Sequence, residues 1–277
     1  MRKRVTVLII AAIVLLGAAW TLWANRALVT TEISVESERV PEPFEGFKIA
    51  HVSDLHNTEF GDGNARLIER LRAAAPDAIA VTGDLVDSRR PDVDTAVNFI
   101  AAASEIAPVY YVTGNHESRL DFSEIEPRLT AAGAVVLRNA AEYIERGGER
   151  IQLAGIDDPA FVRSQESAGE RAASELDGLI DASAFSVLLA HRPDLIGTYA
   201  EYGADLVLSG HAHGGQVRLT LVGALYAPGQ GFLPEYTDGL HRVDGAQMVV
   251  SRGLGNSLFP LRFDNRPELL VVELRRV

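Results

Sequence analysis

Residues 78–87 read AIAVTGDLVD, an apolar stretch that runs directly into a polar turn. The five residues Ala78–Thr82 are uncharged and of the kind found in a buried strand. Gly83 follows them, and the carboxylates Asp84 and Asp87 lie just beyond it. The stretch therefore predicts a buried strand whose carboxyl end carries an acidic side chain.

The same arrangement occurs four more times along the chain. The apolar run Ile49–Ser53 is followed by Asp54-Leu55-His56, and Val109–Thr113 by Gly114-Asn115-His116-Glu117. Likewise, Phe185–Ala190 is followed by His191, and Leu206–Ser209 by Gly210-His211-Ala212-His213. Apolar residues with helical spacing lie between some of these runs and end at Pro76 and Pro108. This alternation predicts an α/β sheet. Further strands are predicted at Gln247–Ser251 and Leu269–Leu274, and a Gly/Pro-rich loop at Tyr226–Thr237.

Polar side chains that follow the strands of an open α/β sheet gather outside its carboxyl edge. Five of the seven histidines of the chain lie in these loops. Imidazole and carboxylate donors, in a chain without cysteine, suit Mn, Fe, Zn or Co. Two ions about 3.5–4 Å apart need a bridging ligand, and a carboxylate serves well. Glycines at 83, 114 and 210 are predicted to let the backbone turn so that the next side chain enters the site.

The residues resemble those of the calcineurin-like metallophosphoesterases, whose pattern is Asp-x-His, Gly-Asp-x-x-Asp, Gly-Asn-His-Asp/Glu, a single His and Gly-His-x-His. All five blocks occur here in order over residues 54–213. The resemblance implies a four-layer α/β/β/α sandwich and two divalent transition-metal ions (Mn, Zn or Fe). The implied ligands are Asp54, His56, Asp84 and His213 for one ion, and Asp84, Asn115, His191 and His211 for the other, with Asp84 bridging.

The resemblance also implies a mechanism. A hydroxide between the two ions attacks phosphorus, and His116 contacts the phosphate and protonates the leaving group. Glu117 stands where many members have Asp, and no firm role is predicted for it. Asp87 is predicted to orient its loop, and His51 to be a core residue within its strand. Arg252 and Arg262 are predicted to be solvated or salt-bridged, with a phosphate contact as the alternative.

Residues 5–23 read VTVLIIAAIVLLGAAWTLW. As a helix they span about 28 Å, close to the thickness of the hydrocarbon core of a bilayer. Arg2, Lys3 and Arg4 precede them and only Arg26 follows closely. The positive-inside rule then predicts a single-pass anchor in the cytoplasmic membrane, with the catalytic domain extracytoplasmic. A cleaved signal peptide and a buried core helix are the alternatives.

The charge of the chain is uneven. The formal net charge is −12 at pH 7, and because residues 1–26 contribute +4, the rest carries −16. So acidic a domain repels phosphate backbones, and no nucleic-acid partner is predicted. Positive charge for a phosphorylated substrate must then come from metal ions. The predicted organisation is a membrane anchor (1–26), a linker with the first strand (27–45) and a metallophosphoesterase domain (46–277).

The substrate prediction rests on the anchor and on three apolar loop segments. Leu219–Tyr226, Gly231–Pro234 and Leu258–Leu261 lie near the catalytic tail, although they would also serve to cover a sheet edge. They favour hydrolysis of a phosphodiester or pyrophosphate bond in a membrane-associated or lipid-linked substrate.

Two further functions are weighed against this one. Tail residues are similar to the bacterial branch of the family with an amino-terminal membrane segment, namely Asn256, Pro260, Arg262, Asn265, Arg266, Pro267 and Glu268. That branch looks like enzymes that hydrolyse UDP-2,3-diacylglucosamine in lipid A biosynthesis. This activity is the alternative, but its substrate lies in the cytoplasmic leaflet, on the other side from the predicted domain. A silent, membrane-tethered binding protein is less favoured, because none of the motif residues is missing.

Overall fold

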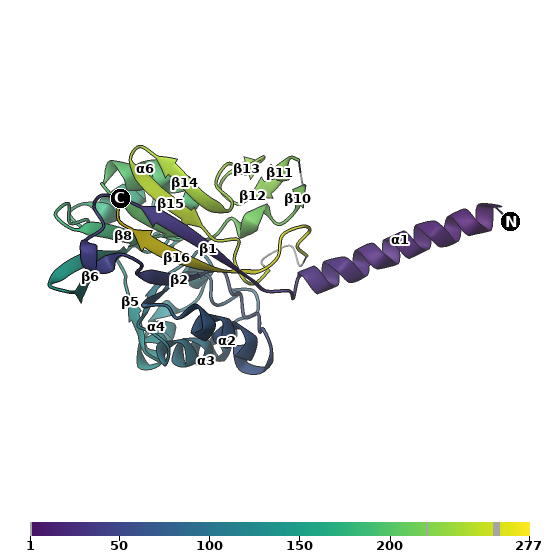
Figure 1. Ribbon diagram of the computed structural model, residues 1–277, viewed down its shortest axis with the longest axis horizontal. Helices are drawn as coiled ribbons and strands as arrows, with labels where there is room; N and C mark the ends of the chain where they lie inside the picture. The colour runs from purple at the N-terminus through teal and green to yellow at the C-terminus, as the bar shows by residue number, and fades with distance from the viewer. Residues whose placement is uncertain (1, 220, 257–260) are drawn as a thin grey trace.

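Two six-stranded sheets stack face to face in the computed structural model, which describes residues 2–219, 221–256 and 261–277 (Figure 1). The first sheet has the order β1 (Val29–Glu36), β16 (Glu268–Arg275), β2 (Lys48–Val52), β3 (Ala78–Thr82), β4 (Val109–Val112) and β5 (Ala134–Val136). Strands β2 to β5 are parallel, whereas β16 runs antiparallel to β2 and parallel to β1.

The second sheet has the order β14 (Gly239–Val243), β15 (Ala246–Val250), β9 (Leu206–Ser209), β8 (Phe185–Leu189), β7 (Glu149–Gly155) and β6 (Ala140–Arg146). Its four central strands are parallel, and its two edge strands are antiparallel to their neighbours. In both sheets the strands that precede the predicted ligands therefore point the same way, and their carboxyl ends share one edge.

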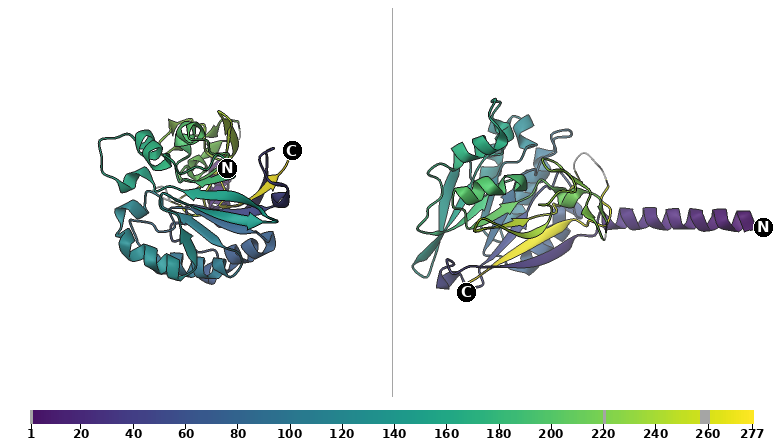
Figure 2. Two further views of the ribbon diagram at one scale, coloured as in Figure 1. Left: turned by 90° about the vertical axis from the view of Figure 1, so that its left-hand side faces the viewer. Right: turned by 90° about the horizontal axis from the view of Figure 1, so that it is seen from above.

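Helices cover the outer face of each sheet (Figure 2). The first sheet carries α2 (Ala65–Ala74), α3 (Val93–Ser104) and α4 (Phe122–Ala131), and the second carries α5 (Ala168–Leu176) and α6 (Ile196–Glu201). Short 3-10 helices occur at η1 (Glu42–Phe44), η2 (Asp62–Asn64), η3 (Glu117–Arg119), η4 (Pro159–Phe161), η5 (Pro193–Leu195) and η6 (His213–Gly215).

Three buried apolar clusters separate these layers. Ile79 and Val81 of β3 join the helices α2 to α4, whereas Ala78 and Ala80 face the second sheet. Alternate side chains of a strand point to opposite faces, so one short apolar run supplies two cores. A third cluster joins the second sheet to α5 and α6. The predicted four-layer α/β/β/α sandwich is confirmed.

The strand predictions agree with the structure to within a few residues at each end. One correction concerns Tyr226–Thr237, which is not all loop. Two small antiparallel ribbons lie in and beside it, formed by β10 (Arg218–Leu219) with β11 (Gly223–Ala224), and by β12 (Tyr226–Ala227) with β13 (Gly231–Phe232). Of the third apolar segment, Leu258–Leu261, only Leu261 lies within the described residues.

The amino-terminal helix α1 (Arg2–Ala24) projects away from the sandwich (Figures 1 and 2). Its segment Arg4–Ala24 is long and apolar enough to cross a membrane, and none of its most apolar window is buried in the protein. The alternative of a buried core helix is therefore wrong, because the helix joins none of the apolar core clusters formed by the described residues.

Candidate metal centre

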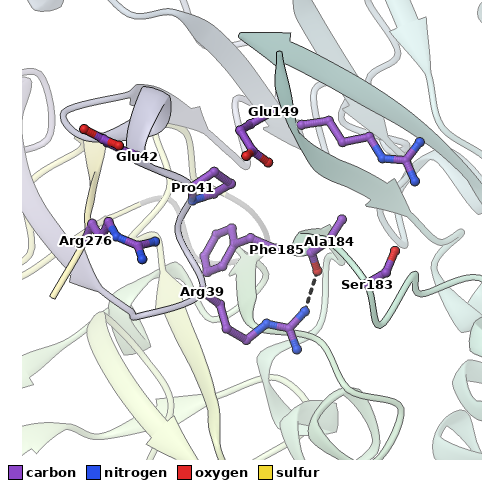
Figure 3. Close-up of a pocket in the computed structure, with 9 residues that line it drawn as sticks. Arg39, Pro41, Glu42, Glu149, Ser183, Ala184, Phe185 and Arg276 are labelled. Atoms are coloured by element: carbon purple, nitrogen blue, oxygen red, sulfur yellow. Dashed lines mark hydrogen bonds between the residues drawn. The ribbon is translucent and has the colours of Figure 1, made fainter. Parts of the chain in front are cut away.

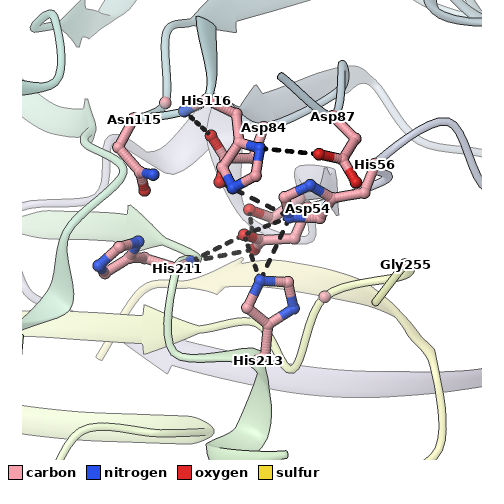
Figure 4. Close-up of polar contacts among 12 residues, drawn as sticks. Asp54, His56, Asp84, Asp87, Asn115, His116, His211, His213 and Gly255 are labelled. Atoms are coloured by element: carbon pink, nitrogen blue, oxygen red, sulfur yellow. Dashed lines mark hydrogen bonds and ion pairs between the residues drawn. The ribbon is translucent and has the colours of Figure 1, made fainter. Parts of the chain in front are cut away.

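The structure brings all the predicted site residues into one cluster at the carboxyl ends of β2, β3, β4, β8 and β9 (Figure 4). Each of these side chains is buried. They come from five loops and from both sheets, so the cluster closes the edge where the two sheets meet. The cluster consists of Asp54, His56, Asp84, Asn115, His116, His191, His211 and His213.

One group of donors forms around Asp54. The Nε2 atoms of His56 and His213 lie 3.2 Å apart, and Asp54 Oδ1 lies 3.4 Å from His213 Nε2. The distance from Asp54 Oδ1 to His56 Nε2 is 3.9 Å. Three donor atoms that converge in this way can share one metal ion.

A second group forms around His191. Its Nε2 lies 3.2 Å from His211 Nδ1, 3.3 Å from Asn115 Oδ1 and 3.4 Å from Asp84 Oδ2. The other ring nitrogen of His191, Nδ1, lies 2.7 Å from the carbonyl oxygen of Thr82. A carbonyl can only accept, so Nδ1 is the donor, and in the neutral ring Nε2 keeps a lone pair directed at the cluster.

Asp84 belongs to both groups. Its Oδ2 atom lies 3.6 Å from His56 Nε2 and 3.4 Å from His191 Nε2, while Oδ1 accepts a hydrogen bond of 2.8 Å from the His116 backbone. Burial alone would raise the pKa of Asp84, but the surrounding histidines, His191 foremost, hold it well below its usual range. Asp84 is therefore an ionised carboxylate between two sets of donors.

The charge states of the histidines fit a metal. Burial lowers the pKa of His56 to about 4 and that of His211 to about 3, so both rings are neutral at pH 7 and can donate a lone pair. Burial also disfavours a charged His191, but the Asp84 carboxylate raises its pKa to about 10. A cation seated beside Asp84 would replace that proton. The donor set, imidazole and carboxylate with no thiolate, suits divalent transition ions.

His116 lies beside the two groups. The backbone N–H of Ser88 donates to His116 Nδ1 at 3.1 Å, and Asp87 Oδ1 lies 3.3 Å from the same nitrogen. The ring stands edge-on to His56, with ring centroids 4.5 Å apart. Asp87 also accepts from the Arg89 backbone at 3.0 Å. Asp87 thus orders its own loop, as predicted, and in addition contacts His116.

The backbone at the cluster takes a conformation that sequence patterns do not reveal. Five of the seven predicted ligands have positive φ angles: Asp54 (53°), His56 (45°), Asp84 (53°), His211 (63°) and His213 (48°). This left-handed region costs a residue with a Cβ roughly 1–3 kcal/mol and recurs at functional sites. Partners elsewhere hold the strained loops, such as the Asp54 carboxylate, which accepts from the His211 backbone at 3.0 Å.

The prediction for the glycines needs correction. Gly83 has a φ of +83° and does make a turn, but Gly114 and Gly210 are not in the left-handed region. At these two positions the constraint is space. A Cβ on Gly114 would overlap the Asp84 carboxylate, and a Cβ on Gly210 would overlap Ser53 and Asp54. The site needs these glycines because neighbouring loops approach so closely.

Glu117, which had no predicted role, braces two of the loops. Its carboxylate is fully buried and accepts from the backbone N–H groups of Asp84 (2.9 Å), Gly114 (2.9 Å) and Val86 (3.2 Å). Burial, together with the nearby Asp84 charge, raises the pKa of Glu117 to about 7, although the backbone donors oppose the rise. Glu117 therefore ties the loop after β4 to the loop after β3.

Arg262 also differs from its prediction. It is fully buried, and it forms no ion pair among the described residues. Its guanidinium donates to the carbonyl oxygens of Gly255 and Arg252 and approaches His213 Nδ1 at 3.5 Å. Arg252 is salt-bridged as predicted, at 2.6 Å from Glu268. His51 is a buried core residue as predicted, with Nε2 at 2.8 Å from Thr82 Oγ1.

A cavity of about 370 Å³ opens onto the cluster. Arg89, Arg119 and Arg192 line it, and sequence reasoning missed all three. Arg192 is held by Asp158 at 2.8 Å and Arg89 by Asp87 at 2.7 Å, whereas Arg119 forms no ion pair in the described part of the chain. The sequence feature that could have identified these arginines is their closeness to the motifs, since each lies within three residues of Asp87, His116 or His191.

A second charged cavity, of about 480 Å³, lies at the amino ends of β7 and β8, away from the cluster (Figure 3). Arg39 and Arg276 line it, but they donate to backbone carbonyls, including that of Ala184 at 2.5 Å and that of Val40 at 2.6 Å. These guanidinium groups hold backbone segments of the fold together, whereas the cavity above the histidines is lined by the candidate metal ligands themselves.

Comparisons with known proteins agree with this geometry. The family model described as calcineurin-like phosphoesterase matches residues 47–215. The chain is 31% identical to the uncharacterized metallophosphoesterase YkuE of Bacillus subtilis, over 89% of this chain and 85% of that one. It is 32% identical to phosphodiesterase YaeI of Escherichia coli, over 82% of each chain. It is 29% identical to a transmembrane protein with metallophosphoesterase domain of Danio rerio, over 99% of this chain and 63% of that one.

Proposed function

The chain belongs to the calcineurin-like phosphoesterase family of metal-dependent phosphoester hydrolases, and from this we propose that it uses two metal ions to hydrolyse a phosphodiester or pyrophosphate bond in a membrane-associated substrate. The observation that carries the proposal is the position of Asp84. Its Oδ2 atom lies within 3.6 Å of one histidine from each donor group. A carboxylate so placed serves as a bridge between two ions.

The predicted ligands would hold the two ions in two sets. Asp54, His56 and His213 hold one divalent ion (Mn, Zn or Fe), and Asn115, His191 and His211 hold the other. Asp84 serves both. The ions, when bound, neutralise phosphate oxygens and lower the pKa of water to near neutrality. They also make the site locally positive within an acidic chain.

His116 is proposed to deliver the proton to the leaving group. In the neutral ring the Ser88 N–H donates to Nδ1. The acid is the imidazolium, in which Nδ1–H can face the Asp87 carboxylate, with Oδ1 3.3 Å away, and the proton on Nε2 is the one available for transfer. Hydrogen bonding from the Ser88 backbone and contact with Asp87 hold the ring in place. A positioned acid of this kind contributes about 10²–10⁴-fold to the rate.

The walls of the cavity support a substrate with more than one negative charge. Arg192 and Arg89 keep fixed orientations through their carboxylate partners, and Arg119 adds a charge without such a partner among the described residues. Phosphate beyond the reacting group would meet these guanidinium groups, which bind phosphate oxygens in a bidentate manner. A pyrophosphate, or a diester that carries a further phosphate group, places a second phosphate within reach of these arginines, which a simple monoester does not.

We also propose that α1 is an uncleaved membrane anchor and that the catalytic domain is extracytoplasmic. The helix begins with three basic residues, and the apolar segment that follows them has no buried residue in its most apolar window. The relative from Danio rerio is itself named a transmembrane protein. A site tethered at a bilayer encounters lipid-linked phosphates more readily than dilute soluble ones.

The test is turnover of a substrate panel by the full chain in detergent, stripped of metal and then loaded with Mn, Zn or Fe. The panel holds bis-p-nitrophenyl phosphate, p-nitrophenyl phosphate and UDP-2,3-diacylglucosamine. We expect diester cleavage to exceed monoester cleavage, and chelation to abolish both. Preferred cleavage of the UDP-linked lipid would instead support the lipid A alternative, and absence of turnover with every metal would support a silent binding protein.

A further inference from the structure

Large apolar side chains stand exposed on the face of the sandwich from which α1 emerges. Leu221 is 98% exposed, Phe232 84% and Leu233 67%. Figures 1 and 2 place the two ribbons that carry them near the carboxyl end of α1, where the helix joins the sandwich. We call this group the ribbon face, and it consists of Leu221, Val222, Tyr226, Phe232, Leu233 and Phe263.

The ribbon face is rigidly connected to the end of α1. Asn25, directly after the helix, accepts from the Arg262 backbone N–H at 2.8 Å and donates to the Arg262 carbonyl at 3.0 Å. The Arg266 guanidinium lies 5.2 Å from the Trp23 ring centroid and donates to the Ala27 carbonyl at 2.8 Å. The helix end therefore has several fixed contacts with the tail of the chain.

The same tail segment connects to the ribbons. Phe263, one residue beyond Arg262, forms a parallel bridge with Val217, and its carbonyl accepts from the Arg218 backbone at 3.0 Å. Leu225 then donates to the Val217 carbonyl at 3.0 Å, and Leu233 donates to the Leu225 carbonyl at 3.0 Å. A continuous hydrogen-bonded path thus runs from the helix end through both ribbons.

This hydrogen-bonded path fixes the depth of the ribbon face relative to the bilayer that α1 would span. If residues 5–23 cross the hydrocarbon, Asn25 lies in the headgroup zone, which is only about 5–8 Å thick on each side. Arg262 and its neighbour Phe263 are held at the same level by the Asn25 hydrogen bonds. Burial of aromatic and aliphatic side chains in this zone is energetically favourable, whereas in water the same side chains form an exposed apolar patch that promotes aggregation.

We propose that the ribbon face is a second membrane contact, which inserts its apolar side chains into the interface of the bilayer that α1 spans. This inference rests on the proposed anchor. Its consequence concerns the active site, because Pro228 and Gly229, in the turn between β12 and β13, line the catalytic cavity. One ribbon therefore touches lipid with its strands and the cavity with its turn, so docking places the cavity beside the lipid headgroups.

The full chain lends itself to a direct test, because it contains no cysteine and only two tryptophans, Trp20 and Trp23. Leu221→Cys and Phe232→Cys are labelled with an environment-sensitive fluorophore, and Val277→Cys, at the far end of the molecule, is the matched control (Figure 1). Each protein is reconstituted into phosphatidylcholine vesicles with or without lipids that carry a shallow doxyl quencher. Tryptophan emission from the unlabelled protein reports on α1 separately.

We expect the labels at 221 and 232 to lose about half of their fluorescence in doxyl vesicles, with little change at 277. If tryptophan is quenched but these labels match the control, the anchor stands and the ribbon contact is overturned. If tryptophan is not quenched either, the anchor and the ribbon contact both fail. Shielding of the labels in detergent that grows with protein concentration would make the face an interface between copies, and would also overturn the proposal.

Discussion

Replacing Arg262 by methionine tests which of two opposing effects decides the energetics of a buried guanidinium. Arg262 is fully buried, and its donors satisfy the carbonyls of Gly255 and Arg252 and the Asn256 side chain, at 3.0 Å for the last. Hydrogen bonds from a charged donor are worth about 1.5–3 kcal/mol each, so removing three costs about 5–9 kcal/mol.

The opposing effect is the burial of charge. Burial lowers the pKa of Arg262 from 12.5 to about 10, which corresponds to about 3 kcal/mol that the charged side chain costs the folded state. Methionine removes that cost while filling much of the same volume. The hydrogen bonds outweigh it, and we expect Arg262→Met to lower the free energy of unfolding by about 2–6 kcal/mol.

The assay is thermal unfolding of the full chain in detergent with a chelator present, so that metal binding does not contribute. At about 2–4 °C per kcal/mol for a chain of this size, the unfolding midpoint should fall by at least about 4 °C. Arg242→Met, on the exposed side of β14, is the matched control and should shift it by less than about 2 °C. An Arg262→Met midpoint equal to or above that of the parent would refute the reasoning, since charge burial would then be the larger effect.

Four further outcomes are expected. Asp84→Ala should lose both metal ions in elemental analysis while Asn115→Ala loses one, because among the described residues Asp84 alone approaches both donor groups; loss of a single ion from Asp84→Ala contradicts the bridge. His116→Ala should keep its metal and lose about 10²–10⁴-fold in turnover of an alkyl phosphodiester, but much less with a nitrophenolate leaving group, which needs no proton; equal losses would remove the acid role. A reporter fused after Val277 should be active only outside the cytoplasm, and cytoplasmic activity would reverse the proposed topology. Burial lowers the pKa of His51 from 6.5 to about 3, so below pH 6.5 the unfolded chain binds a proton that the folded chain does not bind. At pH 5 this difference should lower the stability of the parent by about 2 kcal/mol relative to His51→Gln. Parallel stability curves for the two proteins between pH 7 and 5 would disprove this prediction.

The sequence by itself determined the buried strands and the chemistry of the donors, and the order of layers followed from its resemblance to a known family. All of β3 is buried because it packs against a core on each face, with Ile79 and Val81 in one and Ala78 and Ala80 in the other, and an uncharged run of this kind can be read from the sequence as a buried strand. The polar residue after each strand was readable for a similar reason. A buried strand ends where polar groups can reach a cavity or water, so Asp84 stands out against the apolar run before it.

Only the tertiary structure decided how those donors meet. Asp84 lies between His56 and His191 because loops from both sheets converge, and no local pattern carries the distance between residues more than a hundred positions apart. The same holds for the tight approach that requires glycine at 210, where the neighbour is Ser53. Contacts of this kind depend on sheet stacking, which follows from packing of the whole chain.

Charged residues were the least predictable from the sequence. Glu117 and Arg262 look like ordinary surface residues, yet both are fully buried because backbone groups from distant loops satisfy their polar atoms. A charge enters a protein interior only where such partners exist, and those partners are assembled by the fold alone. The sequence names the donors and the strands that carry them, whereas three-dimensional packing decides which charges are buried, which line the cavity and where the site lies relative to α1.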